Sequence, residues 1–465
     1  YNSPAATTPW GMVRLGPDTA SMLVDIRGLN SSGYFYGDNK IIGFSHNRLL
    51  GADAFDGGNF RIFPTIESRV EKLRSADRST PFSHKEEIAF PGYYAVRLPS
   101  EQTLVELTAS TRVGFHRYTF SGNENPHLLI DVSSSLGDAR TKEGKVRIVP
   151  ASQEIEGLIV NFGSFSGRYG GLNVFFVARF NRPFAEYGTW SADGFESGRE
   201  EAEGDSLGAD VAFEGENVET VVEVRLALSH VSIENARLNL DTEIGDDRNF
   251  EQVLEEAKQA WEEKLSLIEV EGGTEAQQRI FYTALYRTLQ MPTLFNDVNG
   301  EYLGFDKQIH VAEGFQYYTD FSLWDTFRTV HPLYNLIVPE VQRDMLVSMV
   351  EMAKAGGCFP RWPSGAGYTN CMIGTPADIM VTESYLKGIR DFDVETAYSK
   401  MRQTALDGKP EGTKFAGRGG LESYLNLGWC ASEKMSKALG KTFEYSYADW
   451  ALASLAKALN HPEDA

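Results

Sequence analysis

The chain has 465 residues, of which 42% are hydrophobic and 23% are charged. A single hydrophobic core stops growing near roughly 250–300 residues, so we expect two domains. Lys and Arg number 44 and Asp and Glu number 65, and the net charge of -21 repels a phosphate backbone. Nucleic acid is therefore excluded as an expected partner. The acidity leaves two interpretations, a well-solvated surface or a carboxylate-rich site for metal or sugar.

Cysteine content and the first residues bear on the compartment. Cys358, Cys371 and Cys430 are too few for a disulfide framework, and their spacing does not match a zinc site. No stretch approaches the roughly 18 apolar residues that would span a bilayer, so we expect no membrane span. The polar, Pro-containing start without an initiator Met predicts that a leader or a first motif has been lost upstream. Such a protein would be secreted, periplasmic or at the cell surface.

The first half of the chain reads in period two. Short runs of alternating apolar and polar residues are separated by Gly, Asn, Asp and Ser, which is typical of half-buried antiparallel strands. The clearest runs place on one face Val222, Val224, Leu226 and Leu228; Tyr94, Val96 and Leu98; and Val174, Phe176, Ala178 and Phe180. Many such strands without long helices between them predict a β-sandwich, which we assign to residues 1–240.

The hydrophobic period then changes to that of a helix. Phe250, Ala257 and Trp261 fall on one face, which predicts a long amphipathic helix that ends before Gly272. We interpret residues 241–272 as a linker helix. Thr274 and Gln277 then form a capping box, which opens a second helix. Its predicted apolar stripe consists of Ile280, Phe281, Ala284, Leu285 and Leu289.

Helical patterns continue to the end of the chain. Helices are expected near residues 322–337, 341–356, 376–390 and 394–405, the third with Thr375 as N-cap and Pro376 at its first position. A last helix carries the stripe Tyr447, Trp450, Ala451, Ser454, Leu455 and Ala458. Helical hairpins after a sandwich predict an α/α toroid, of which residues 273–465 form the first part. The loops 295–318 and 356–375 are longer than the usual connections, which favours a binding role for them.

The densest group of chemistry-bearing residues lies around Trp324 and Asp325. Both start off the predicted buried stripe near a helix N-terminus, where an indole can stack on a sugar ring and a carboxylate can accept its hydroxyl hydrogen bonds. A structural interpretation competes with this one. Ser322 and Asp325 match an S-x-x-D cap, and Asp325 and Arg328 are spaced as an i,i+3 ion pair.

Other candidates are weaker by sequence alone. Asn370 lies in a Gly-rich loop and could hydrogen-bond hydroxyls, while its neighbour Cys371 is either a buried inert thiol or a nucleophile. His46 lies in a Gly-bounded loop and is either a satisfied loop residue or a ligand-binding one. Glu444 and Asp449 are a possible carboxylate pair, although five residues apart on a helix they diverge.

Taken together, these segments resemble glycoside hydrolase family 92, the calcium-dependent α-mannosidases. In the first half the matching motifs are Pro9-Trp10-Gly11-Met12-Val13, Gly16-Pro17-Asp18-Thr19, Gly43-Phe44-Ser45-His46, Phe82-Ser83-His84, Pro91-Gly92-Tyr93-Tyr94 and Phe115-His116-Arg117-Tyr118. In the second half they are Phe321-Ser322-Leu323-Trp324-Asp325-Thr326-Phe327-Arg328, His331-Pro332-Leu333, Asn370-Cys371-Met372-Ile373-Gly374, Tyr385-Leu386-Lys387-Gly388, Glu444-Tyr445 and Asp449-Trp450.

The resemblance implies a β-sandwich packed on an (α/α)6 barrel and the removal of terminal α-linked mannose with inversion from N-glycan or mannan-type glycans. Trp324 and Asp325 match the family residues that hold the terminal mannose. His46, Asn370 and Cys371 match motif positions close to the pocket, and so does Glu444.

The resemblance also implies where the bond is cleaved. Inversion needs a carboxylic acid and a carboxylate base roughly 6.5–9.5 Å apart, and the family places both, with the Ca²⁺-binding segment, in later barrel helices. We therefore expect the general acid, the base and the calcium ligands beyond Ala465, with no metal ligand in the chain itself. Neither Asp325 nor Glu444 is assigned as the acid or the base.

Specificity and two alternative functions stay open. Thr375-Pro376-Ala377-Asp378 stands where a common form of the family pattern has an aromatic residue and a His, so 1,2-, 1,3-, 1,4- and 1,6-linkages and a mannose phosphodiester all stay possible. One alternative is a non-catalytic carbohydrate-binding or assembly fragment. The other is a different enzyme of sandwich and toroid, such as a glucosidase or a disaccharide phosphorylase.

Overall fold

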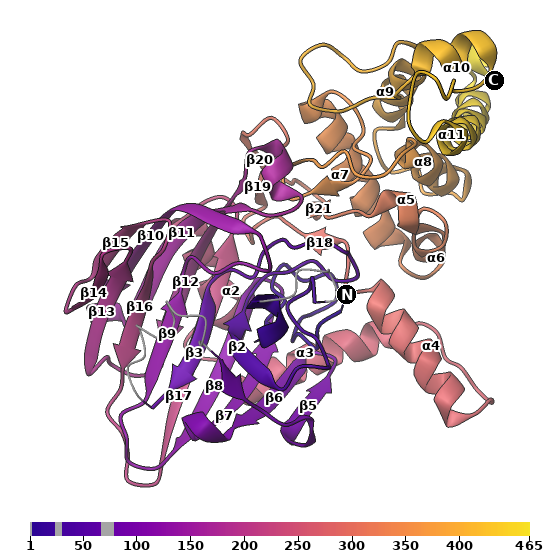
Figure 1. Cartoon of the computed structure of the whole chain (residues 1–465). Coiled ribbons are helices and arrows are strands. Elements are labelled where there is room, and N and C mark those ends of the chain that lie inside the picture. Colours follow the sequence, from indigo (N-terminus) through magenta and orange to yellow (C-terminus); the bar gives the residue numbers. More distant parts are fainter. Residues whose placement is uncertain (1, 24–29, 67–78) are drawn as a thin grey trace. The chain divides into compact units, whose positions relative to one another are not determined.

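The computed structural model describes residues 2–23, 30–66 and 79–465 (Figure 1). They divide into two compact units. We call Tyr1–Met291 with Asp297–Asn299 the sheet domain, and Pro292–Asn296 with Gly300–Ala465 the helical domain. The predicted order, a sheet-rich half followed by a helical half, is confirmed.

Antiparallel strands of the described residues form two large sheets in the sheet domain. The eight-stranded sheet has the order β1-β2-β3-β9-β16-β13-β14, with β4 on β2, and comprises β1 (Gly16–Thr19), β2 (Lys40–Ser45), β3 (Arg61–Thr65), β4 (Thr80–Pro81), β9 (His127–Asp131), β13 (Glu186–Ser191), β14 (Gly194–Ser197) and β16 (Gly208–Ala212). The nine-stranded sheet has the order β15-β10-β11-β12-β17-β8-β7-β6-β5 and comprises β5 (Glu87–Phe90), β6 (Tyr93–Leu98), β7 (Thr103–Ala109), β8 (Val113–Ser121), β10 (Arg140–Val149), β11 (Glu154–Phe162), β12 (Leu172–Phe180), β15 (Glu201–Gly204) and β17 (Glu219–Ser229).

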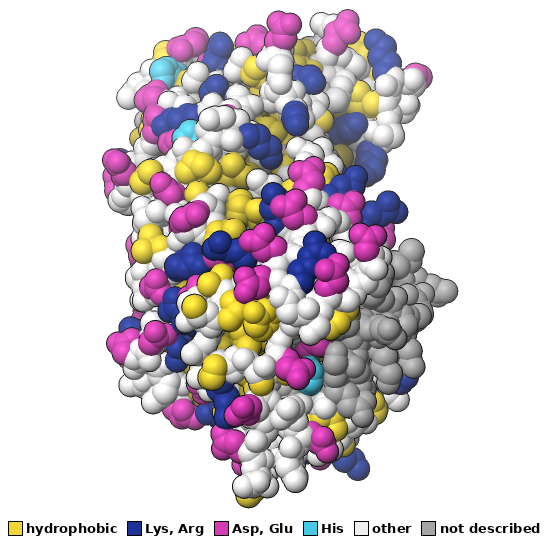
Figure 2. Space-filling model, turned by 90° about the vertical axis from the view of Figure 1, so that its left-hand side faces the viewer, with side chains coloured by type: hydrophobic (Ala, Val, Ile, Leu, Met, Phe, Trp, Pro, Cys, Tyr) yellow, Lys and Arg dark blue, Asp and Glu magenta, His cyan; other side chains and the backbone are white. Residues whose placement is uncertain are grey.

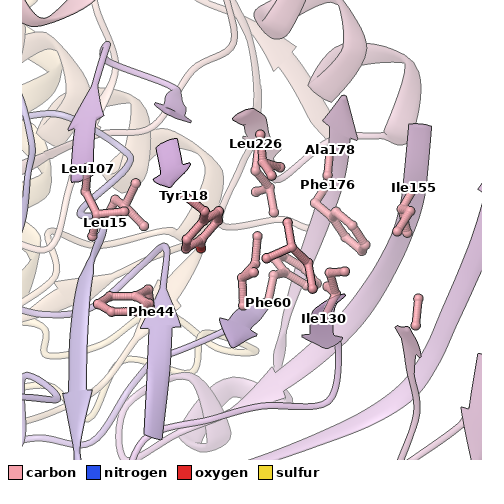
Figure 3. Packing of buried hydrophobic residues seen from close by; sticks show 14 of the residues in the cluster. Leu15, Phe44, Phe60, Leu107, Tyr118, Ile130, Ile155, Phe176, Ala178 and Leu226 are labelled. Atoms are coloured by element: carbon pink, nitrogen blue, oxygen red, sulfur yellow. The ribbon is translucent and has the colours of Figure 1, made fainter. Parts of the chain in front are cut away.

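The alternation in the sequence sets which face of each strand is buried. Val222, Val224 and Leu226 on β17 are all fully buried, as predicted, and pack in one hydrophobic core with Phe176 of β12. Residues of the other sheet, such as Ile130, belong to the same core, and Figure 3 shows side chains of both sheets meeting there. Burial of this many apolar side chains at roughly 1.5–3 kcal/mol each is the main force that holds the sandwich together.

Helices cover the outer face of the nine-stranded sheet. Helix α2 (Ile233–Ile244) packs its buried side chains against the outward-facing residues of β8, β12 and β17, and α3 (Phe250–Leu265) joins the same cluster. The helix predicted from Phe250, Ala257 and Trp261 is thus confirmed as α3, but the single linker helix assigned to residues 241–272 is wrong, because α2 ends at Ile244 and α3 begins only at Phe250. Trp261 fixes α3 to the start of the chain, because its indole Nε1 donates to the Thr7 carbonyl at 2.6 Å.

Helix α4 (Glu275–Thr288) begins at the predicted capping box, in which Thr274 and Gln277 hydrogen-bond each other's backbone. Its predicted apolar stripe is only half correct. Leu285 and Leu289 are buried, but Ile280 is 70% exposed in the described structure. Periodicity shows that apolar residues share a face, and it does not show that the face is covered.

The helical domain combines helices with short hairpins inside its long loops. Its helices are α5 (Leu323–Thr326), α6 (Val330–Ile337), α7 (Pro339–Gly356), α8 (Pro376–Leu386), α9 (Val394–Leu406), α10 (Leu421–Leu427) and α11 (Ala438–Leu459). Its hairpins pair β18 (Thr293–Leu294) with β21 (Tyr318–Thr319), β19 (Glu301–Leu303) with β20 (Ile309–Val311), and β22 (Pro363–Ser364) with β23 (Gly367–Tyr368). None of the helices in the described ranges has both the length and the apolar character that a membrane crossing requires.

Two helix predictions need correction. The single helix expected over 322–337 is broken between α5 and α6, because Pro332 has no N–H and its ring would clash with the carbonyl of Arg328 in a continuous helix. On α11, Ala451 and Leu455 are buried as predicted, but Trp450 is 65% exposed. The buried face of α11 runs instead through residues such as Tyr445, Ala448 and Leu452.

One buried guanidinium fixes the start of the sheet domain. Arg48 is fully buried, and its Nη1 lies 3.3 Å from Oδ1 of Asp18. The other carboxylate oxygen of Asp18 accepts a hydrogen bond from the Nε of Arg61 at 2.7 Å. The remaining N–H groups of Arg48 donate to the carbonyls of Arg14, Gly16, Pro17, Ser32 and Ser45 and to the hydroxyls of Ser3 and Ser45. Side chains far apart in the sequence thus converge on one cation.

Replacing Arg48 by Ala should lower the free energy of unfolding of the sheet domain by about 3–5 kcal/mol, because several buried carbonyls would lose their donor. Chemical unfolding followed by circular dichroism measures the change. Lys145→Ala is the matched control, since the ion pair of Lys145 with Glu203 lies on the surface. If both variants unfold at the same denaturant concentration, the role assigned to Arg48 is wrong.

Candidate functional site

Trp324 and Glu444, predicted separately as sugar-site residues, are in direct contact. The Nε1 of Trp324, on α5, donates to Glu444 Oε1, on α11, at 3.1 Å. Arg328 donates to the same oxygen at 3.1 Å, and its guanidinium carbon lies 4.7 Å from the centroid of the Trp324 ring. Glu444 therefore fixes the indole in one orientation, while Arg328 covers part of one indole face.

Asp325 is exposed beside this group. Its backbone N–H donates to the Ser322 carbonyl at 2.9 Å, and its Oδ2 accepts a short hydrogen bond from the Ser322 hydroxyl. The predicted ion pair between Asp325 and Arg328 is wrong, because Arg328 pairs with Glu444 instead. Ser322 is the N-cap residue of α5 by position, but its side chain makes no cap hydrogen bond. The carboxylate of Asp325 is thus held from one side and open to solvent.

Asn370 is bound inside its own domain. Its Nδ2 donates to the Lys414 carbonyl at 2.9 Å, and its Oδ1 accepts from the Ala416 N–H at 2.8 Å. A sugar hydroxyl could reach this amide only as an additional partner or by displacing one of these bonds. Cys371 is a free, half-buried thiol, and its backbone N–H donates to Thr369.

The same loop passes directly against the residue that orients Trp324. Gly374 has a φ of +78°, and a Cβ added there would lie 2.9 Å from the Cβ of Glu444. Only a glycine permits this close approach. Arg361 fixes the loop, because its guanidinium donates to the carbonyls of Gly374, Met372 and Gly417. No pattern in the sequence predicted this role of Arg361.

A buried charged network lies at the start of α8. Asp378 accepts from the hydroxyl of Thr375 at 2.6 Å and pairs with Arg418 at 3.2 Å, while Arg418 also pairs with Asp449 of α11. Burial raises the pKa of Asp378 to about 6, against the opposing effect of Arg418. Thr375 has the predicted N-cap position, but its hydroxyl donates to Asp378 and makes no cap hydrogen bond.

His46 lies in the sheet domain and is fully buried. Its Nδ1 is 2.8 Å from the Phe60 carbonyl, and its Nε2 is 2.7 Å from the Nε2 of His116, whose Nδ1 is 2.8 Å from the Tyr118 hydroxyl. Each donor in this series has an acceptor if both rings are neutral. His46 Nδ1–H then donates to the Phe60 carbonyl, His116 Nε2–H to His46 Nε2, and the Tyr118 hydroxyl to His116 Nδ1. Both ring nitrogens of His46 thus have protein partners, and its predicted contact with substrate stays a prediction.

Two family profiles cover almost the whole chain. The profile of the glycosyl hydrolase family 92 N-terminal domain matches residues 2–229, and that of the glycosyl hydrolase family 92 catalytic domain matches residues 235–465. The chain belongs to glycoside hydrolase family 92. The resemblance seen in the sequence motifs is therefore confirmed.

Solved family 92 structures share this fold. The GH92 alpha-mannosidase from Bacteroides thetaiotaomicron, also solved in complex with mannoimidazole, is similar with a TM-score of 0.89 at 29% identity, over 100% of this chain and 61% of that chain. The GH92 inverting mannosidase from Bacteroides thetaiotaomicron VPI-5482 gives a TM-score of 0.87 at 28% identity, over 99% and 60%. The predicted sandwich followed by a helical toroid is thereby confirmed.

A protein of Arthroderma benhamiae, described as an uncharacterized secreted glycosidase, is 25% identical, with coverage of 98% of this chain and 58% of that protein. The chain thus spans about three fifths of the length of these relatives.

On the face drawn in Figure 2, acidic side chains are interspersed with basic ones, and hydrophobic side chains lie between them in small groups. Within the described ranges no group of three or more His, Cys, Asp or Glu side chains is placed to hold a metal ion.

The buried histidine pair predicts acid sensitivity of the sheet domain. Burial lowers the pKa of His46 to about 3 and that of His116 well below its usual range. Unfolded histidines bind protons below about pH 6.5 and the folded ones do not, so stability is complete above that pH and falls as the pH decreases toward 3. From pH 6.5 to 5.0 the loss should be about 1.6 kcal/mol per ring, because the slope is half of about 1.36 kcal/mol per pH unit at pH 6.5 and approaches the full value below it.

Denaturant titrations at pH 6.5 and 5.0 measure this loss. The His84→Asn variant lacks a partly exposed imidazole of the same domain. It should lose as much stability between the two pH values as the wild type does. A sheet domain of equal stability at both pH values would contradict the neutral pair.

Proposed function

We propose that the protein to which this chain belongs is an exo-acting α-mannosidase that removes terminal α-linked mannose with inversion. The proposal is supported by the family assignment and by relatives whose printed descriptions are an alpha-mannosidase and an inverting mannosidase. N-glycan or mannan-type glycans are the proposed substrates. Export from the cytoplasm is part of the proposal and is supported by the description of the Arthroderma benhamiae relative as secreted.

The observation that carries the proposal is the pairing of an oriented indole with an open carboxylate on α5. Trp324 is held at its Nε1 by Glu444, and Asp325 is the next residue, exposed and tied through only one carboxylate oxygen in the described contacts. A sugar ring packed on the free part of the indole would place its hydroxyls within reach of Asp325. A carboxylate that accepts hydroxyl hydrogen bonds as the ring distorts toward an oxocarbenium ion stabilises the transition state.

Each residue then has a binding or positioning role. Trp324 and Asp325 hold the terminal mannose, and Glu444 orients the indole. Glu444 is also ion-paired with Arg328, at 3.1 Å. Asn370 and Cys371 form the neighbouring wall, which Arg361 holds in place. The general acid and base are not assigned among these residues.

Asp325→Ala should lower kcat/KM for an α-mannoside by 100-fold or more, about 2.7 kcal/mol of transition-state binding. Steady-state release of mannose by the protein that contains this chain measures the effect. Ser322→Ala is the matched control, because it removes the tether of Asp325 and keeps the carboxylate. If both variants stay within about threefold of the wild type, Asp325 is a helix-end residue and the proposed site is wrong.

We further propose that calcium assists the reaction. The family resemblance motivates this part, and the described residues add no ligand set of their own. Chelation with EGTA should abolish mannose release and leave the unfolding of the sheet domain unchanged. Mannose release that survives chelation would contradict calcium assistance, and release of glucose or dependence on phosphate would contradict the α-mannosidase as a whole.

A further inference from the structure

A small polar hollow lies on the outer face of the eight-stranded sheet. It has a volume of about 110 Å³ and is lined by residues of β9, β13, β14 and β16. At about 30 Å³ per water molecule, it offers the space of roughly four waters. All of its lining belongs to the sheet domain, and none of the residues in the proposed mannose site takes part.

The hollow exists because a glycine stands in the middle of this sheet face. Gly188 of β13 pairs with Asp210 on one side and Ser197 on the other. A Cβ on Gly188 would lie 2.7 Å from the ring of Phe195. The ring therefore packs directly over the glycine and forms one wall of the hollow, and Phe195 remains 38% exposed.

The opposite wall presents a buried carboxylate. Asp210 is only 3% exposed, and its Oδ1 lies 2.9 Å from the Nδ1 of His127. His127 donates its Nδ1–H to this carboxylate, and its Nε2 is a second polar atom of the same ring. Glu186 adds a carboxylate at the rim, and Ser197 adds a hydroxyl. The hollow thus combines several hydrogen-bond acceptors with one aromatic wall.

We infer that this hollow is a second, non-catalytic sugar-binding site, which takes the hydroxyl edge of a single pyranose with one C–H face against Phe195. Sugars meet both requirements, since each hydroxyl donates to an acceptor and the ring C–H groups pack on an aromatic side chain. The volume is smaller than a whole hexose, so the hollow admits one edge of a single ring and not a chain of sugars. The choice of mannose as the sugar rests on the proposed function.

Two other ligand classes fit less well. The described residues include no group of three or more His, Cys, Asp or Glu placed to hold a metal ion, which argues against a divalent cation. An ammonium group would find the exposed carboxylate of Glu186 at the rim, where an ion pair contributes little to affinity. Asp210 already has the imidazole of His127 as a partner.

Calorimetric titration of the 465-residue chain with methyl α-D-mannopyranoside tests the inference. Trp324→Ala should keep one weak binding event, and adding Phe195→Ala to it should weaken that event at least tenfold. Asp210→Asn is the second variant, in case loss of the ring disturbs the edge strand. Phe90→Ala is the matched control, because Phe90 is an equally exposed, 38% accessible aromatic residue on another strand of the same domain.

The outcomes separate this inference from the proposed function. Binding that disappears in Trp324→Ala and is unchanged in Phe195→Ala overturns the second site and leaves the proposed mannose site intact. Binding that persists in Trp324→Ala and is lost in Phe195→Ala supports the second site, whatever the catalytic outcome. Binding of n-butylamine in place of the mannoside, or of neither ligand, overturns the inference.

Discussion

A single buried cation, the guanidinium of Arg48, sets the arrangement of the first strands. A charge without water is costly unless its hydrogen bonds are all made, so the carbonyls around Arg48 must converge on it. The chain meets this constraint by bringing Asp18 of β1 and the turn after β2 to the same point, with Arg61 of β3 on the other side of Asp18. The contacts of Arg48 and Asp18 thus connect β1, the turn after β2 and β3, which are consecutive strands of the eight-stranded sheet.

Most of the fold could be predicted because burial on one face leaves a period in the sequence. The period-two run ending at Leu228 identified a strand correctly, since every alternate residue meets the core. The predictions failed where the outcome depends on another part of the structure. Ile280 and Trp450 have the right helical spacing and are exposed, because periodicity does not show what covers a face. The break before Pro332 could have been predicted, since its missing N–H is visible in the sequence.

The sequence singled out the candidate residues, but it did not predict which of them hydrogen-bond one another. Trp324 and Glu444 are 120 residues apart, and their hydrogen bond depends on how α5 and α11 pack. Local spacing assigned Arg328 to Asp325, three residues away, but the carboxylate of Glu444 lies close to both the indole and the guanidinium and takes the cation. Ser322 then binds Asp325 instead. The ion pair predicted from local spacing, Asp325 with Arg328, is thus replaced by a long-range one, Glu444 with Arg328. The carboxylate of Glu444 also accepts the indole N–H of Trp324.

The motif residues differ in how many hydrogen bonds their side chains already make within the protein. His46 and Asn370 have protein partners at each polar side-chain group, so a ligand would have to compete with bonds whose loss costs about 1–3 kcal/mol when buried. Asp325 has an exposed carboxylate, and a ligand hydroxyl can replace water there at little cost. The family motifs had already separated Asp325, assigned to the terminal mannose, from His46 and Asn370, which they placed only close to the pocket. In the proposed mannose site, the contacts favour Asp325 and the indole of Trp324 as the groups that meet a sugar directly. For His46 and Asn370 they favour a structural role, in which the side chains support the surrounding backbone.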